Sequence, residues 1–145
     1  MGALNSSAIR ESMSSWLNSY SWDLFITYTF EEHFSFDSAK RALDRHYSRM
    51  KAKFNREYPF FYVVEPHSNY ALSGTHAHGL VGGVADIRLS GKRMQVDWCS
   101  HQGHGVFEFD KYMEDKGAGY YLTKYLVKSE YDQSFWDVYN LPSNI

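Results

Sequence analysis

The chain has 145 residues, a length that predicts one domain with room for a proper core. Apolar residues make up 43% of the chain and charged residues 22%, a balance that excludes an intrinsically disordered chain. The single cysteine, Cys99, excludes an internal disulfide framework. The net charge of −2 excludes binding to nucleic acid through bulk charge, though not through a local basic patch.

The first half of the chain predicts a helix, a strand and a second helix. Residues 6–20 favour a short helix, and residues 22–30, rich in β-branched and aromatic side chains, favour a strand. Asp37 or Ser38 can cap the second helix, which is expected to run to about position 57. Apolar residues at helical spacing predict its buried stripe: Ala39, Leu43, Tyr47, Met50 and Phe54.

The second half of the chain predicts mostly strands. Two of them form a hairpin with a long polar loop, 60–66 and 75–81, and a short alternating strand follows, 105–110. Residues 117–128 predict a helix, and residues 129–145 predict an irregular aromatic tail. Residues 86–100 have no readable pattern. This order predicts an α+β domain over residues 1–145, with a central antiparallel β-sheet and flanking helices packed mainly on one face.

Two histidines lie two positions apart in the predicted strand 75–81. Because alternate residues of a strand point to one face, His76 and His78 present their imidazoles side by side. A hairpin symmetric about positions 70 and 71 places Glu65 opposite His76, and His67 is a rival third ligand. Two imidazoles and a carboxylate predict a divalent metal with open coordination positions. The alternative is that both histidines are ordinary strand residues.

The choice of metal stays open at this point. Imidazole ligands suit zinc, manganese, nickel or cobalt, whereas a carboxylate with a phosphate substrate suits Mg²⁺ or Mn²⁺.

The predicted helix 117–128 carries tyrosines and lysines on one face. On a helical wheel, a sector of about 100° contains all four of these residues: Tyr121, Lys124, Tyr125 and Lys128. A phenol is a weak nucleophile, but a nearby ammonium stabilises both the phenolate and the charge that develops on a phosphate. Attack on a phosphodiester would then form a phosphotyrosine ester. The alternative is an amphipathic helix with solvated lysines and tyrosines.

The predicted helix 37–57 carries seven basic and three acidic residues. Four of the basic residues recur at i, i+4 spacing and could follow a phosphate backbone: Arg41, Arg45, Arg49 and Lys53. The alternative is a solvated outer face. Lys92 and Arg93, expected in a loop, are a second candidate DNA contact. Trp98 could stack on a base, whereas Phe107 is better suited to the core.

Because of the histidine pair and the tyrosine–lysine segment, the sequence resembles the HUH endonucleases. These enzymes nick single-stranded DNA to initiate rolling-circle replication, mobilise plasmids and move some transposons. Three segments match the family's motifs in order: FITYTF at 25–30, THAHGL at 75–80 and YLTKYLVK at 121–128. The last segment is the YxxK motif written twice, and it is similar to that of the two-tyrosine replication initiators of isometric single-stranded DNA phages and of related viral and plasmid Rep proteins.

The resemblance implies a role for each motif residue. The fold would be an RNA-recognition-motif-like, or ferredoxin-like, palm. His76, His78 and Glu65 would hold Mg²⁺ or Mn²⁺. Tyr121 would be the first nucleophile and Tyr125 the second, with two lysines that assist at the phosphate, Lys124 and Lys128.

The implied activity is metal-dependent, site-specific nicking and joining of a single-stranded DNA origin or hairpin, through a 5′-phosphotyrosine intermediate. Host helicase and polymerase are the expected partners, because 145 residues leave no room for a helicase, and no small-molecule cofactor is implied. No apolar run or signal pattern indicates a membrane, so the cytoplasm, or that of a host cell, is expected. Two other functions stay open: a hydrolase whose metal activates water, and a non-catalytic module that binds single-stranded nucleic acid.

Overall fold

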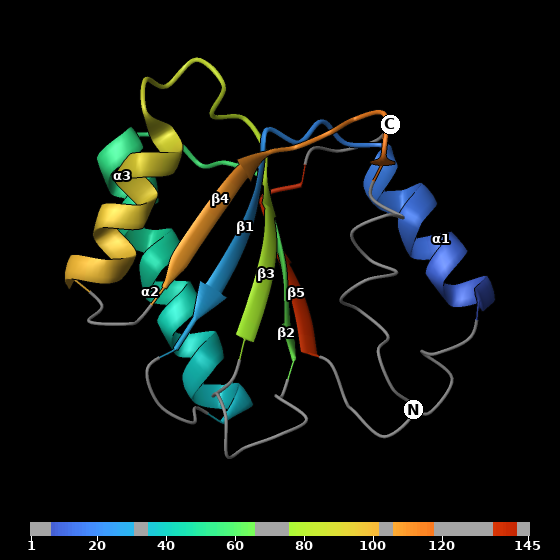
Figure 1. Ribbon diagram of the computed structural model, residues 1–145, viewed down its shortest axis with the longest axis horizontal. Helices are drawn as coiled ribbons and strands as arrows, with labels where there is room; N and C mark the ends of the chain where they lie inside the picture. Colours follow the sequence, from blue (N-terminus) through green and yellow to red (C-terminus); the bar gives the residue numbers. More distant parts are fainter. Residues whose placement is uncertain (1–6, 31–34, 66–75, 102–105, 118–134, 142–145) are drawn as a thin grey trace.

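The computed structural model describes residues 7–30, 35–65, 76–101, 106–117 and 135–141 (Figure 1). The helix predicted over 117–128 therefore lies outside the described residues, apart from its first position. Within the described residues, no helix is both long enough and apolar enough to span a membrane.

Five strands form one antiparallel sheet in the order β4-β1-β3-β2-β5. The strands are β1 Leu24–Thr29, β2 Phe60–Glu65, β3 His76–Val81, β4 Phe107–Lys111 and β5 Phe135–Tyr139. The helices are α1 Ser7–Asn18, α2 Phe36–Phe54 and α3 Ser90–Val96, which continues into a π-helical turn, η2 Asp97–His101. The predicted α+β class with a central antiparallel sheet is confirmed. The run β1-α2-β2-β3-α3-β4 is the βαββαβ order of ferredoxin-like folds.

The sheet has a hydrophobic core on each side. Helices α2 and α3 lie on one side and α1 on the other (Figure 1). On the α2 side the predicted stripe is confirmed, because all five of its residues are buried. On the α1 side, Met13 and Leu17 pack with Phe61, Val63 and Leu80. Strand β2 therefore alternates between the two cores, and the neighbours Leu80 and Val81 of β3 belong to different cores.

Helix α2 begins and ends earlier than the sequence predicts. Its N-cap is Ser35, whose Oγ accepts a hydrogen bond from the Ser38 backbone N–H at 3.1 Å, so the predicted caps Asp37 and Ser38 are wrong. At the other end Asn55 adopts a left-handed conformation (φ 53°, ψ 43°) and donates its N–H to carbonyls of the last turn. The helix therefore ends at Phe54, three residues before Glu57.

Two segments differ in kind from the prediction. Residues 90–96, which have no readable pattern, form α3, so Lys92 and Arg93 lie on a helix rather than in a loop. The tail predicted to be irregular contains strand β5, which pairs with β2. The ring of Tyr139 stacks on Tyr47 at a centroid distance of 4.6 Å. These partners are far apart in the chain, and local patterns carry no sign of them.

A buried carboxylate joins α2 to η2. Asp97 is fully buried, and its Oδ2 lies 2.7 Å from His46 Nδ1. Its Oδ1 accepts a hydrogen bond from Arg49 Nε at 2.8 Å, and Lys53 Nζ lies 3.5 Å away. Burial alone would raise the pKa of Asp97, but the hydrogen bonds from His46 and Arg49 outweigh burial and lower the pKa to about 2. Burial lowers the pKa of His46, so the ring is neutral and donates Nδ1–H to Asp97.

Replacing Asp97 by alanine is expected to lower the free energy of unfolding at pH 7 by about 2–4 kcal/mol, because hydrogen bonds from charged groups are lost and His46 Nδ1–H is left buried. Urea denaturation measures this change. Asp86→Ala is the matched control, because Asp86 is 69% exposed in its pair with Arg56. Its cost is expected to be much smaller than that of Asp97→Ala, because solvent screens an exposed ion pair. Equal losses in the two variants would contradict a stabilising role for the buried cluster.

The same cluster predicts acid sensitivity. Asp97 has a lowered pKa in the folded state, so its contribution to stability is complete above about pH 4, the usual range of a free aspartate, and is lost as the pH falls toward 2. His46 also has a lowered pKa in the folded state. Below about pH 6.5 its imidazole therefore takes up protons more readily in the unfolded chain, and the free energy of unfolding falls as the pH falls. Asp97→Ala is expected to flatten the part of the decline below pH 4.

Candidate functional site

The strand register brings the predicted metal ligands to one face of the sheet. In the β2–β3 hairpin Glu65 pairs with His76, as the symmetric hairpin predicts. Residues directly opposite each other in an antiparallel pair point to the same face, and so do residues two positions apart in one strand. His76, His78 and Glu65 therefore share the face that also carries Leu80, which belongs to the α1 core.

The imidazole of His78 is held on two sides by β1. Thr27, directly opposite in the register, has its Oγ1 3.2 Å from His78 Nδ1. The ring of Phe25 is stacked parallel to the imidazole, with a centroid distance of 6.0 Å and an interplanar angle of 2°. Only 5% of His78 is exposed. The imidazole is therefore buried beside β1, with Nδ1 directed at the Thr27 hydroxyl.

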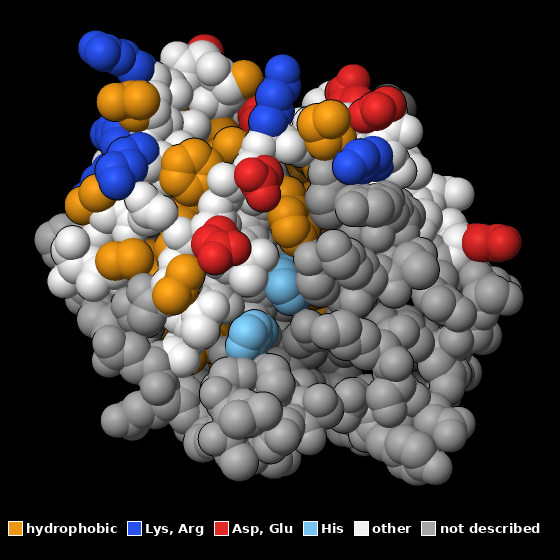
Figure 2. Space-filling view, in the orientation of Figure 1, with side chains coloured by type: hydrophobic (Ala, Val, Ile, Leu, Met, Phe, Trp, Pro, Cys, Tyr) orange, Lys and Arg blue, Asp and Glu red, His pale blue; other side chains and the backbone are white. Residues whose placement is uncertain are grey.

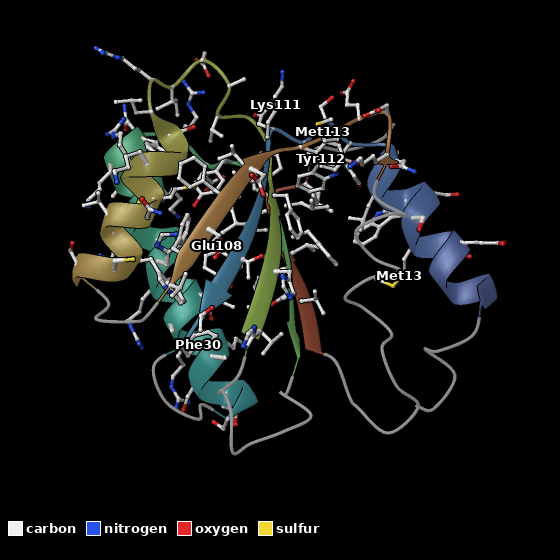
Figure 3. The ribbon with its side chains drawn as sticks, viewed as in Figure 1. Met13, Phe30, Glu108, Lys111, Tyr112 and Met113 are labelled. Atoms are coloured by element: carbon white, nitrogen blue, oxygen red, sulfur yellow. The ribbon has the colours of Figure 1, made fainter. Side chains whose placement is uncertain are left out.

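Strand β4 extends this polar face toward the edge of the sheet. Glu108 pairs with Thr27 and Asp110 pairs with Phe25, so both carboxylates project to the histidine face, and both are exposed. Figure 2 shows histidine and acidic side chains near one another over the middle of this face, and Figure 3 places Glu108 on β4. The sequence prediction did not include Glu108 or Asp110, although the alternation of GVFEFD already sets them opposite the two phenylalanines.

The donor set of the hairpin fits a divalent metal ion. Two imidazoles and one carboxylate on adjacent strands are the ligand types that hold such an ion while leaving positions open. Among side chains that the structure describes, no three His, Cys, Asp or Glu residues form a group that could hold a metal. The Glu65 side chain is not among them, and the rival ligand His67 also lies outside the described residues. The role of this set as ligands stays a prediction.

The predicted DNA-contact residues of α2 lie on the other face of the sheet. Arg41 and Arg45 are exposed, as a phosphate contact requires. Arg49 and Lys53 differ, because both reach the buried carboxylate of Asp97. The stripe is therefore in part a structural element, and the sheet separates it from the histidine pair.

The other predicted contacts also lie on the α2 side. Lys92 Nζ donates to Gln95 Oε1 at 3.0 Å, and the Arg93 guanidinium lies 4.8 Å from the centre of the Phe54 ring. Trp98 is fully buried, so its predicted stacking on a base is wrong for this fold. Phe107 is buried in the core, as predicted.

The four residues predicted to carry the phosphoryl chemistry lie outside the described residues: Tyr121, Lys124, Tyr125 and Lys128. Their roles stay predictions from the motif.

A cavity of about 610 Å³ lies away from the histidine pair. Its lining includes Leu24 and Lys111, which pair with each other at the end of β1, whereas Thr29 at the other end pairs with His76. Lys111, Tyr112 and Met113 lie together at this end of the sheet in Figure 3. The candidate metal site is therefore at the other end of the sheet and not in this cavity.

A comparison with known protein families shows to which family the chain belongs. The family model described as replication-associated protein ORF2/G2P matches residues 23–130, which include strands β1 to β4 and the histidine pair. The chain belongs to this family. No curated protein and no solved structure matches it. Membership gives this replication-associated protein a role in DNA replication, and a nickase is compatible with that role.

Proposed function

We propose that this replication-associated protein is an HUH-type endonuclease domain over residues 1–145 that nicks and rejoins single-stranded DNA to initiate rolling-circle replication. The observation that carries the proposal is the register of the β2–β3 hairpin. It sets Glu65 opposite His76 and puts His78 on the same face, in a member of a replication family. A domain that only bound single strands would have no need of this donor set on its central strands.

The donor set supports a metal-assisted reaction at a phosphate. His76, His78 and Glu65 would hold Mg²⁺ or Mn²⁺, and the ion, when bound, would draw electron density from a phosphate oxygen. The phenol oxygen of Tyr121 bonds to phosphorus and loses its proton, while the bond from phosphorus to the 3′ oxygen breaks and that oxygen takes up a proton. The ammonium of Lys124 stabilises the charge in the transition state, and Lys128 does the same for Tyr125.

The phosphotyrosine ester explains how a small domain can both cut and join. The ester keeps the free energy of the broken phosphodiester, so rejoining needs no nucleotide cofactor. The free 3′ hydroxyl can prime synthesis by a host polymerase, in the cytoplasm of a host cell, after a host helicase has separated the strands. Tyr125 would allow a second transfer before the first ester is resolved.

Exposed basic residues on the α2 side support a second DNA contact. Arg41 and Arg45 on α2 are exposed, as are Lys92 and Arg93 on α3. Since these residues lie behind the sheet, we assign them to DNA flanking the nicked phosphate rather than to the phosphate itself. Arg49 and Lys53 can contribute through their exposed portions, because each side chain is 41% exposed beside Asp97.

A denaturing gel tests the proposed function. The purified protein is mixed with a randomised single-stranded DNA library and Mn²⁺, and the expected result is a covalent protein–DNA band that is absent when a chelator is added. Cleavage without a covalent band would contradict the proposal and favour a metal-activated water nuclease. A protein that retains single strands without cleaving them would contradict it as well and favour a binding module. Duplex DNA of the same composition is the matched control.

A further inference from the structure

Two threonines of β1 lie opposite the histidine pair, Thr27 opposite His78 and Thr29 opposite His76. Thr27 lies between His78 on β3 and Glu108 on β4 in the register, and its Oγ1 is 3.2 Å from His78 Nδ1. A β-branched side chain in a strand has few χ1 rotamers, so this hydroxyl is held in place. The ring of Phe25 lies parallel to the imidazole, with a centroid distance of 6.0 Å. The direction of the hydrogen bond between Thr27 and His78 therefore depends on which ring nitrogen of His78 carries the proton.

We propose that Thr27 is a positioning residue for the metal site. Its hydroxyl oxygen accepts a hydrogen bond from Nδ1–H of His78, so the lone pair of Nε2 is left to bind the metal. This inference rests on the proposed function, because it assumes that His78 binds an ion. A hydrogen bond to the second ring nitrogen is the usual way in which proteins orient a histidine ligand and raise its basicity.

The opposite direction of the hydrogen bond would have a different consequence. If Thr27 donated its hydroxyl proton to Nδ1, the proton of the neutral ring would sit on Nε2, and that nitrogen could not bind a metal. Nδ1 would itself be engaged with Thr27, on the side of β1 and away from His76. Only the arrangement with Nδ1–H as donor is compatible with a shared ion between His78 and its neighbours on β3 and β2.

Two substitutions separate the hydroxyl from the shape of the side chain. Thr27→Val keeps the branched shape and removes the hydroxyl, whereas Thr27→Ser keeps the hydroxyl. Isothermal titration with Mn²⁺ is expected to show a loss of affinity of about 10–100-fold in Thr27→Val. Thr27→Ser is expected to keep most of the affinity. Urea denaturation without metal checks that all three proteins are equally folded.

A metal-free measurement tests the tautomer itself. In a long-range ¹H–¹⁵N spectrum of the wild-type protein, His78 is expected to be protonated on Nδ1, and Thr27→Val is expected to shift it toward the Nε2–H form. His78→Gln identifies the signals of this ring. A wild-type ring protonated on Nε2, or equal Mn²⁺ affinities in wild type and Thr27→Val, would overturn the role of Thr27. A wild-type protein that binds no Mn²⁺ would instead contradict the metal site of the proposed function.

Discussion

Replacing Tyr121 by phenylalanine is expected to abolish the covalent adduct between the protein and single-stranded DNA. The change removes one oxygen atom, which is the atom that bonds to phosphorus, and leaves the size of the ring unchanged. The adduct carries the DNA fragment on the 3′ side of the nick, so an oligonucleotide labelled at its 3′ end reports it on a denaturing gel. Phosphoamino-acid analysis of the adduct identifies the linkage.

Tyr125→Phe is the matched control for this prediction, because it removes the same oxygen four positions further along the motif. It is expected to form the first adduct at the wild-type rate and to lose only a second transfer. If Tyr121→Phe forms as much adduct as the wild type, the first nucleophile is a different residue, and loss of the adduct in Tyr125→Phe would assign it.

Replacing His78 by alanine is expected to reduce Mn²⁺-dependent cleavage by about 1,000-fold or more, because a metal that polarises a phosphate oxygen contributes several kcal/mol to the transition state. Cleavage of a labelled single strand at a series of Mn²⁺ concentrations measures the loss. Since His78 is buried, His78→Gln is made in parallel to keep most of the volume, and circular dichroism confirms that each variant is folded.

His101→Ala is a suitable control for the histidine variants, because residue 101 ends η2, which packs with α2 rather than on the histidine face. Its cleavage rate is expected to equal that of the wild type. Metal-dependent cleavage that survives in His78→Ala, with a normal response to Mn²⁺, would rule out His78 as a ligand.

The parts of the fold that local patterns determine could be predicted. The buried stripe of α2 follows from helical spacing, and the pairing of Glu65 with His76 follows from the two-residue period of strands and a symmetric hairpin. Both features depend on residues close together in the chain. This is why the candidate ligand set could be proposed before the fold was known.

The features that depend on distant partners could not be predicted. Strand β5 forms by pairing with the edge of β2, and the sequence of residues 135–139 does not specify that partner. The helical spacing of Arg49 predicts that it lies in a solvent-exposed basic stripe. In the structure it pairs with Asp97, which lies 48 positions away in the chain. The side of the sheet on which α2 packs also depends on topology, so the separation of the basic stripe from the histidines was not visible in the sequence.

Strand β5 has a further consequence for the candidate ligands. With β5 in place, β2 is paired on both sides from Phe60 to Val64, and β3 lies between β1 and β2. Backbone positions inside a ladder open only with the cooperative unit around them, whereas edge strands fray. An ion bound by His78 would meet a donor whose main chain already lies inside the ladder between β1 and β2, so little of its backbone entropy would remain to be lost on binding. Truncation of the chain before residue 135 would remove the β5 partner of β2 and leave β3, which carries the histidines, between β1 and β2.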